Sequence, residues 1–164
     1  MKVALCALSL VLAAPAFGAV PESANPQIDY AGHARLVADV GKERPKRLLS
    51  LAEFKAMAAK GVTVLDARSA WAYKAGHIEG AVSLPLTDFT PEDVQRVLGD
   101  PKKPVLIYCN NDFKNRRRPV ALKSAPAAVN IQTSVALAAY GYTNVWELGE
   151  VIDFDDPAVG WVKG

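Results

Sequence analysis

Cysteine and histidine are scarce in this sequence of 164 residues, which contains two of each. The cysteines are Cys6 and Cys109, and no spacing of cysteine and histidine suits a structural metal site, so we expect neither a metal ion nor a cofactor. An excess of either charge is also missing, since 19 basic residues stand against 17 acidic ones. This balance argues against nucleic acid or an anionic membrane as the main partner.

A long apolar run is absent as well. The apolar stretch at residues 3–14 is too short to span a bilayer, which needs about 20 residues. It follows Lys2 and precedes the small residues Ala14, Ala16 and Gly18, as in a secretory signal peptide. We therefore predict a signal peptide at residues 1–19, with an uncleaved anchor as the alternative. The mature protein is then periplasmic or secreted, with no stable membrane insertion after the signal is removed.

Removal of residues 1–19 leaves Cys109 as the single cysteine of the mature chain. A lone thiol in an exported protein cannot form an internal disulfide, so it is either inertly buried or reactive. Cys109 directly follows an apolar, β-branched run at residues 105–108 that indicates a buried strand. In an open α/β sheet, ligands bind just outside the carboxyl ends of the strands, where backbone N–H groups favour a thiolate.

The remaining pattern alternates short strands with helices. We expect an N-terminal arm at residues 20–47 with a short helix near 33–39, and one domain at 48–164. Strands are expected at 62–65, 81–84, 105–108 and 144–148, and helices at 50–60, 69–75, 90–98 and 133–140. This alternation predicts an α/β fold with a mostly parallel sheet covered by helices on both faces.

Four motifs carry a resemblance to a known family. They are Asp66-Ala67-Arg68, then Gly76-His77-Ile78-Glu79-Gly80-Ala81 with Leu84-Pro85, then the cysteine at a strand end, then Tyr140-Gly141-Tyr142-Thr143-Asn144-Val145. In this order and spacing, over about residues 48–150, they resemble the rhodanese-like domain. The resemblance implies a three-layer fold with a parallel sheet of about five strands between helices.

The resemblance also implies sulfurtransferase activity. Sulfane sulfur would pass from a small donor anion such as thiosulfate, through a Cys109 persulfide, to a thiophilic acceptor: a thiol, cyanide or a partner protein. In this family the loop after the cysteine forms a tight ring whose N–H groups hold the persulfide anion. The expected substrate-binding loop is Asn110, Asn111, Asp112, Phe113, Lys114, Asn115 and Arg116. Asp66, Arg68 and His77 are expected to be structural, because buried polar groups need partners.

The loop departs from the family pattern in two ways. It contains no glycine and places Asp112 near the thiol, where a carboxylate would repel both a thiolate and an anionic donor. The path from Cys109 to Tyr140 is also about a dozen residues longer than expected, which places an insertion at 115–128. Lys114 and Arg116 would lower the pKa of Cys109 if they faced it; the alternative is a solvated basic face.

Two other functions remain open. A non-catalytic sulfur-carrier or protein-binding module would keep the fold and the cysteine with little turnover. A phosphatase or arsenate reductase of related fold would use a Cys-x5-Arg loop, but the position that completes this pattern here is Asn115, with Arg116 one place later.

Overall fold

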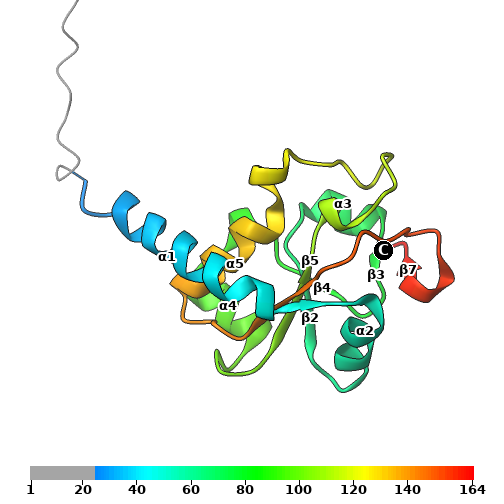
Figure 1. Ribbon diagram of the computed structural model, residues 1–164, viewed down its shortest axis with the longest axis horizontal. Coiled ribbons are helices and arrows are strands. Elements are labelled where there is room, and N and C mark those ends of the chain that lie inside the picture. Colours follow the sequence, from blue (N-terminus) through cyan, green and yellow to red (C-terminus); the bar gives the residue numbers. More distant parts are fainter. Residues whose placement is uncertain (1–24) are drawn as a thin grey trace, which may run out of the picture.

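A single parallel sheet organises the molecule. The computed structural model describes residues 25–164, so the predicted signal peptide at residues 1–19 lies outside the described residues. Five strands pair in the order β1-β6-β5-β2-β4, all parallel (Figure 1). The strands are β1 (Leu48–Leu49), β2 (Thr63–Asp66), β4 (Val82–Ser83), β5 (Val105–Tyr108) and β6 (Val145–Leu148). The predicted α/β fold with a parallel sheet is confirmed.

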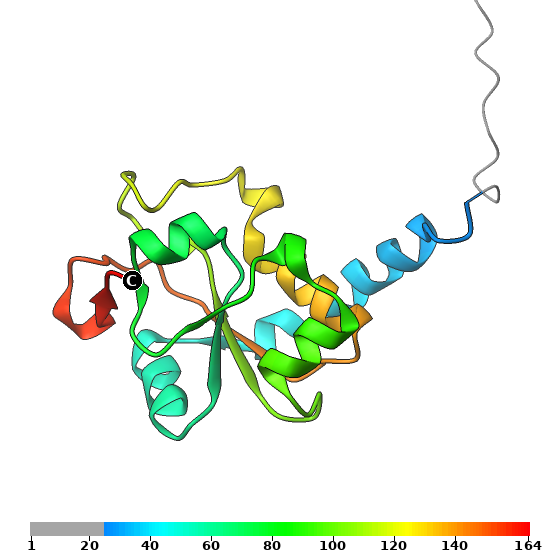
Figure 2. The same ribbon diagram turned by 180° about the vertical axis from the view of Figure 1, so that it is seen from behind.

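Helices cover both faces of this sheet (Figures 1 and 2). Alternate side chains of β5 point to opposite faces, so Leu106 packs in a core cluster with Phe54 of α2 (Leu51–Ala59). Ile107 packs in a second cluster with Val94 of α4 (Pro91–Leu98) and Leu137 of α5 (Val129–Ala139). The short helix α3 (Ala70–Ala75) follows β2, and the 3-10 turn η3 (Leu86–Asp88) precedes α4.

The clearest helix signals of the sequence lie where the helices begin. Ser50 caps α2, because its hydroxyl accepts from the Glu53 N–H while the Glu53 carboxylate accepts from the Ser50 N–H at 2.9 Å. Thr90 caps α4 in front of Pro91, the first helical residue. These two starts agree with the predicted helices at 50–60 and 90–98.

Two helices are longer than predicted. Helix α1 spans Tyr30–Glu43 rather than residues 33–39, since the Asp29 carboxylate accepts from the Gly32 N–H at 2.7 Å and caps an earlier start. It lies beside α5, contributes no fully buried residue and continues into η2 (Arg44–Lys46) (Figure 1). Helix α5 begins at Val129 instead of 133, directly after η5 (Ala125–Ala127).

The C-terminal tail folds back onto the domain. Strand β7 (Trp161–Val162) follows η6 (Pro157–Val159) and pairs antiparallel with β3 (His77–Ile78). Its Trp161 ring packs against Phe113 and Phe154, which anchors the segment after Cys109 to the core. No helix within residues 25–164 is both long and apolar enough to cross a membrane.

Candidate functional site

The site is built around Cys109, the residue that follows β5. All four residues of β5 are buried, and the chain then enters the 3-10 turn η4 (Asn110–Asp112), for which Cys109 is the N-cap. The Cys109 side chain has no exposed surface, yet it lines a pocket of about 500 Å³. We call this cavity the thiol pocket. Its other walls come from α1, η4, the start of α5 and the segment after β6.

Backbone N–H groups from two elements face the sulfur. The Asn111 N–H donates to Cys109 Sγ at 3.4 Å. The N–H groups of Val129 and Asn130, the first two residues of α5, face the same atom and act to lower its pKa. The N-terminus of a helix carries partial positive charge and unpaired donors, so this arrangement can hold an anion on the sulfur.

This geometry differs from the expected ring of loop N–H groups. Within the loop, only Asn111 donates to the sulfur. The Asp112 N–H donates to the Cys109 carbonyl at 3.2 Å, and the Lys114 N–H donates to the Ile152 carbonyl at 2.9 Å. The loop therefore makes one 3-10 turn and leaves the site, because without glycine it does not curl around a single atom.

Two loop amides connect the sulfur site to the inserted segment. Asn110 is buried, accepts from Arg68 at 3.3 Å and donates to the Ala121 carbonyl at 2.9 Å. Asn111 donates to the Lys123 carbonyl at 2.9 Å and accepts from the Lys123 N–H at 3.1 Å. The insertion predicted at 115–128 is thus fastened to the residues beside Cys109.

The rest of the predicted loop does not reach the thiol. Phe113 is buried in the aromatic cluster with Tyr108, Phe154 and Trp161. Lys114 pairs with Asp153 at 3.2 Å, and the Asn115 amide donates to the same carboxylate at 2.6 Å. Arg116 is exposed. These four loop residues do not line the thiol pocket, so the structure does not bring the predicted cations to Cys109.

Asp112 is the charged group that does reach the site. Its Oδ2 accepts from the Cys109 N–H at 2.7 Å and from the Asn130 amide at 3.1 Å. Burial raises the pKa of Asp112 to about 7. Burial first, and the Asp112 charge second, raise the pKa of the Cys109 thiol to about 11. The resting side chain at neutral pH is therefore a thiol, contrary to the lowered pKa that cationic neighbours would have produced.

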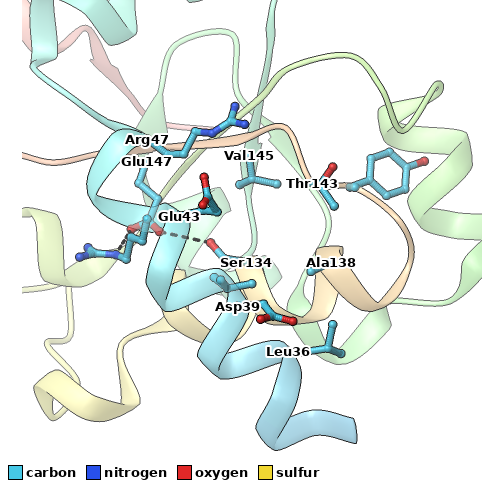
Figure 3. A pocket seen from close by; sticks show the side chains of 12 residues that line it. Leu36, Asp39, Glu43, Arg47, Ser134, Ala138, Thr143, Val145 and Glu147 are labelled. Carbon is cyan, nitrogen blue, oxygen red and sulfur yellow. Dashed lines mark hydrogen bonds and ion pairs between the residues drawn. The ribbon is translucent and has the colours of Figure 1, made fainter.

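A buried carboxylate, Glu147 of β6, forms another wall of the thiol pocket. Arg44, just after α1, pairs with it at 3.0 Å, and the Ser134 hydroxyl donates to it at 3.3 Å. Figure 3 shows Glu147 and Ser134 facing each other. Both residues line a second pocket of about 250 Å³, whose lining includes residues of α1 and α5. Glu147 thus borders both pockets.

The three residues expected to be structural lie away from the thiol pocket. Arg68 is buried and pairs with Asp66 at 2.6 Å, and it also donates to the Gly76 carbonyl at 2.7 Å. His77 Nδ1 lies 2.9 Å from the Tyr73 carbonyl, and its ring stacks on the Tyr73 ring. These contacts join β2 to the turn before β3, and none of the three residues lines the thiol pocket.

The sequence did not indicate Val129 and Asn130 as part of the site. Helix α5 starts after Ala128, which offers no capping side chain, so no start signal marks this position. Because no side chain caps this helix, its first N–H groups remain available to the sulfur. Among residues 25–164, no three His, Cys, Asp or Glu side chains are grouped so as to hold a metal ion.

One family model matches more than half of this chain. The family model for the rhodanese-like domain matches residues 50–149. Similar solved structures include a Bacillus halodurans protein with 22% identity, TM-score 0.48, covering 70% of this chain and 74% of that one. A rhodanese with anions from E. coli has 25% identity, TM-score 0.42, and covers 62% and 98%. A human single-domain sulfurtransferase has 20% identity, TM-score 0.44, and covers 63% and 90%. No curated protein matches the sequence.

Proposed function

The chain belongs to the rhodanese-like domain family, and from this premise we propose that it is an exported sulfurtransferase that carries sulfane sulfur on Cys109. One observation carries the proposal. The Cys109 sulfur lines a pocket of about 500 Å³ and faces the N–H groups of Asn111, Val129 and Asn130. A persulfide extends a thiol by one sulfur and bears its negative charge there, so donors at this position favour the loaded form.

The reaction proceeds in two half-reactions. The Cys109 thiolate attacks the outer sulfur of a donor such as thiosulfate, a new S–S bond forms, and sulfite leaves with the electron pair of the broken bond. An acceptor thiol or cyanide then attacks the terminal sulfur of the persulfide, and the Cys109 thiolate is released. Because the intermediate is covalent, the kinetics should be ping-pong. Cys109, with a pKa of about 11, must lose its proton before it attacks.

Loading of Cys109 is the direct test. The protein is incubated with thiosulfate or an organic persulfide, and the peptide that contains Cys109 is analysed by mass spectrometry. We expect this peptide to gain the mass of one sulfur atom, and the gain to disappear on reduction. The variant Cys109→Ala should gain nothing in the corresponding peptide. A wild-type peptide that stays unmodified with every donor would refute the proposal.

A sulfur-carrier or protein-binding module is the second candidate. The complete burial of the Cys109 side chain and its raised pKa favour slow chemistry in the isolated protein. Steady-state turnover of thiosulfate and cyanide distinguishes a carrier from an enzyme. A carrier takes up one sulfur atom per molecule and then stops, whereas an enzyme goes on to form product over many cycles. A phosphatase or arsenate reductase is disfavoured, because Asn115 hydrogen-bonds to Asp153 and Arg116 does not line the thiol pocket.

Export is proposed from residues 1–19 alone. The protein is produced from its full coding sequence in a bacterium, and the cell fractions are separated. We expect the chain in the periplasmic or secreted fraction, with an intact mass that lacks the signal peptide. A full-length chain in the cytoplasmic fraction would contradict this proposal.

A further inference from the structure

Three carboxylates line the pocket that contains the Cys109 thiol. Asp112, Glu147 and Glu150 line it together with Cys109, and Arg44 is the one cation among its lining residues. The Arg44 Nε lies 3.0 Å from Glu147 Oε2, so the charge of this cation is already balanced. With Asp112 ionised, the pocket carries two uncompensated negative charges. Such a pocket repels a dianion such as thiosulfate and attracts a cation.

An unpartnered acceptor points to the same kind of ligand. Asn130 lines the thiol pocket and is only 4% exposed, and its amide nitrogen donates to Asp112. Its Oδ1 is buried and has no hydrogen-bond partner within the described part of the chain. Buried amide oxygens in native proteins are nearly always hydrogen-bonded, so this unpaired acceptor leaves a further partial negative charge in a lining residue, and that charge also favours a cation in the pocket.

The remaining walls limit the size and character of the ligand. The lining also includes Val37 and Val40 of α1 and Ile131 and Val135 of α5. These side chains suit a short alkyl stem, whereas the polar lining offers acceptors and negative charge. A small thiol with an ammonium group on a short carbon chain has the matching chemistry.

On the basis of the proposed sulfur transfer, we propose that the thiol pocket selects ammonium-bearing thiols and their persulfides over anionic sulfur donors. In the loading step, the Cys109 thiolate attacks the outer sulfur of R–S–SH, the S–S bond of the donor breaks, and RS⁻ leaves with its electron pair. The proton that Cys109 loses before the attack is balanced by the proton that RS⁻ takes up afterwards. The step therefore exchanges a thiol for a persulfide and needs no oxidant. In the reverse direction the same pocket accepts the free ammonium thiol as acceptor.

Three persulfides that differ only in their end group test this selection. They are the persulfides of cysteamine, 2-mercaptoethanol and 3-mercaptopropionate, which end in an ammonium, a hydroxyl and a carboxylate. The second-order rate constant for loading Cys109 is measured on the full chain from the mass of the Cys109 peptide. We expect the ammonium donor to load about tenfold faster than the carboxylate donor, with the hydroxyl donor between them and thiosulfate slowest.

Two variants that each remove one negative charge test whether the selection of donors depends on the charge of the thiol pocket. Glu150 is exposed and its Oε2 accepts from the Leu51 N–H at 2.8 Å, an interaction that glutamine can keep. Glu150→Gln should reduce the ammonium-to-carboxylate ratio about threefold, since screening weakens an exposed charge. Asp100→Asn removes the same charge before the start of β5, at the end opposite Cys109, and should leave the ratio unchanged.

The outcomes separate this inference from the proposed function. Equal loading by the three persulfides, or fastest loading by thiosulfate, would overturn the selection and leave sulfur transfer intact. Equal ratios in wild type and Glu150→Gln would overturn the role of the acidic pocket. Loading by none of the donors would overturn the proposed function itself.

Discussion

The substitution Asp112→Asn tests how the buried carboxylate beside Cys109 restrains the thiol. Burial is the largest cause of the rise in the Cys109 pKa to about 11, and the charge of Asp112 is the next. Asparagine keeps a carbonyl oxygen for the Cys109 N–H, which donates to Asp112 Oδ2 at 2.7 Å, and removes the charge. We expect the pKa of Cys109 to fall by about one unit, the usual scale for loss of one close like charge.

The assay is alkylation of Cys109 by iodoacetamide across a pH series, followed on the Cys109 peptide. At about pH 8, a pKa of about 11 leaves roughly one thiol in a thousand ionised, and a fall of one unit raises that fraction about tenfold. A less basic thiolate is also a weaker nucleophile, so the net rate constant should rise about threefold. Asp100→Asn serves as the distant control. A titration midpoint in Asp112→Asn that equals or exceeds that of the wild type would refute the reasoning.

Other buried polar groups give three further outcomes in urea unfolding. Asp112 has a pKa of about 7 in the folded chain and of about 4 in the unfolded chain, so the folded protein binds one more proton between these pH values. The free energy of unfolding should therefore fall by about 2 to 3 kcal/mol from pH 5 to pH 8 in the wild type. This fall should be absent in Asp112→Asn. Arg44→Met strips buried Glu147 of its cation and should cost about 2 to 4 kcal/mol, whereas Lys46→Met removes an exposed pair and should cost under about 0.5. Tyr108→Phe removes a hydroxyl that bonds a buried carboxylate at 2.6 Å and a buried N–H at 3.1 Å, at a cost of about 2 to 3 kcal/mol. Stability that does not change with pH, equal losses in the arginine and lysine variants, or a neutral tyrosine variant would contradict the respective prediction.

Local signals were sufficient for most of the fold. The capping box at Ser50 and the Thr90-Pro91 start depend on residues next to each other in sequence, so both helices were predictable. The apolar run before Cys109 likewise fixed a buried strand with the cysteine at its carboxyl end. Placement of the tail was not predictable, because Trp161 finds Phe113 through tertiary packing that leaves no periodic pattern.

The electrostatics of the site depends on which loop side chains face the thiol, and sequence spacing left this open between Asp112 and the basic residues that follow it. Lys114 and Arg116 are close to Cys109 along the chain, but η4 turns the backbone so that Lys114 meets Asp153 instead. Asp112 lies on the first turn and is held beside the thiol by the Cys109 N–H. The raised pKa of Cys109 is chiefly an effect of burial, and burial depends on tertiary packing, because the start of α5, which is distant in sequence, faces the sulfur.

The inserted segment accounts for the position of α5, which begins beside the Cys109 sulfur although many residues separate the two in sequence. A short family loop places the next helix directly after the cysteine, whereas here residues 115–128 intervene and α5 begins at Val129. Asn110 and Asn111 hold this segment by hydrogen bonds to Ala121 and Lys123, and the chain returns through η5 to the same spot. The first N–H groups of α5 therefore still face the sulfur, while the loop contributes a single N–H group, that of Asn111. It follows that two of the three donors for a persulfide belong to α5, and that shortening the insertion would disturb the site by moving this helix.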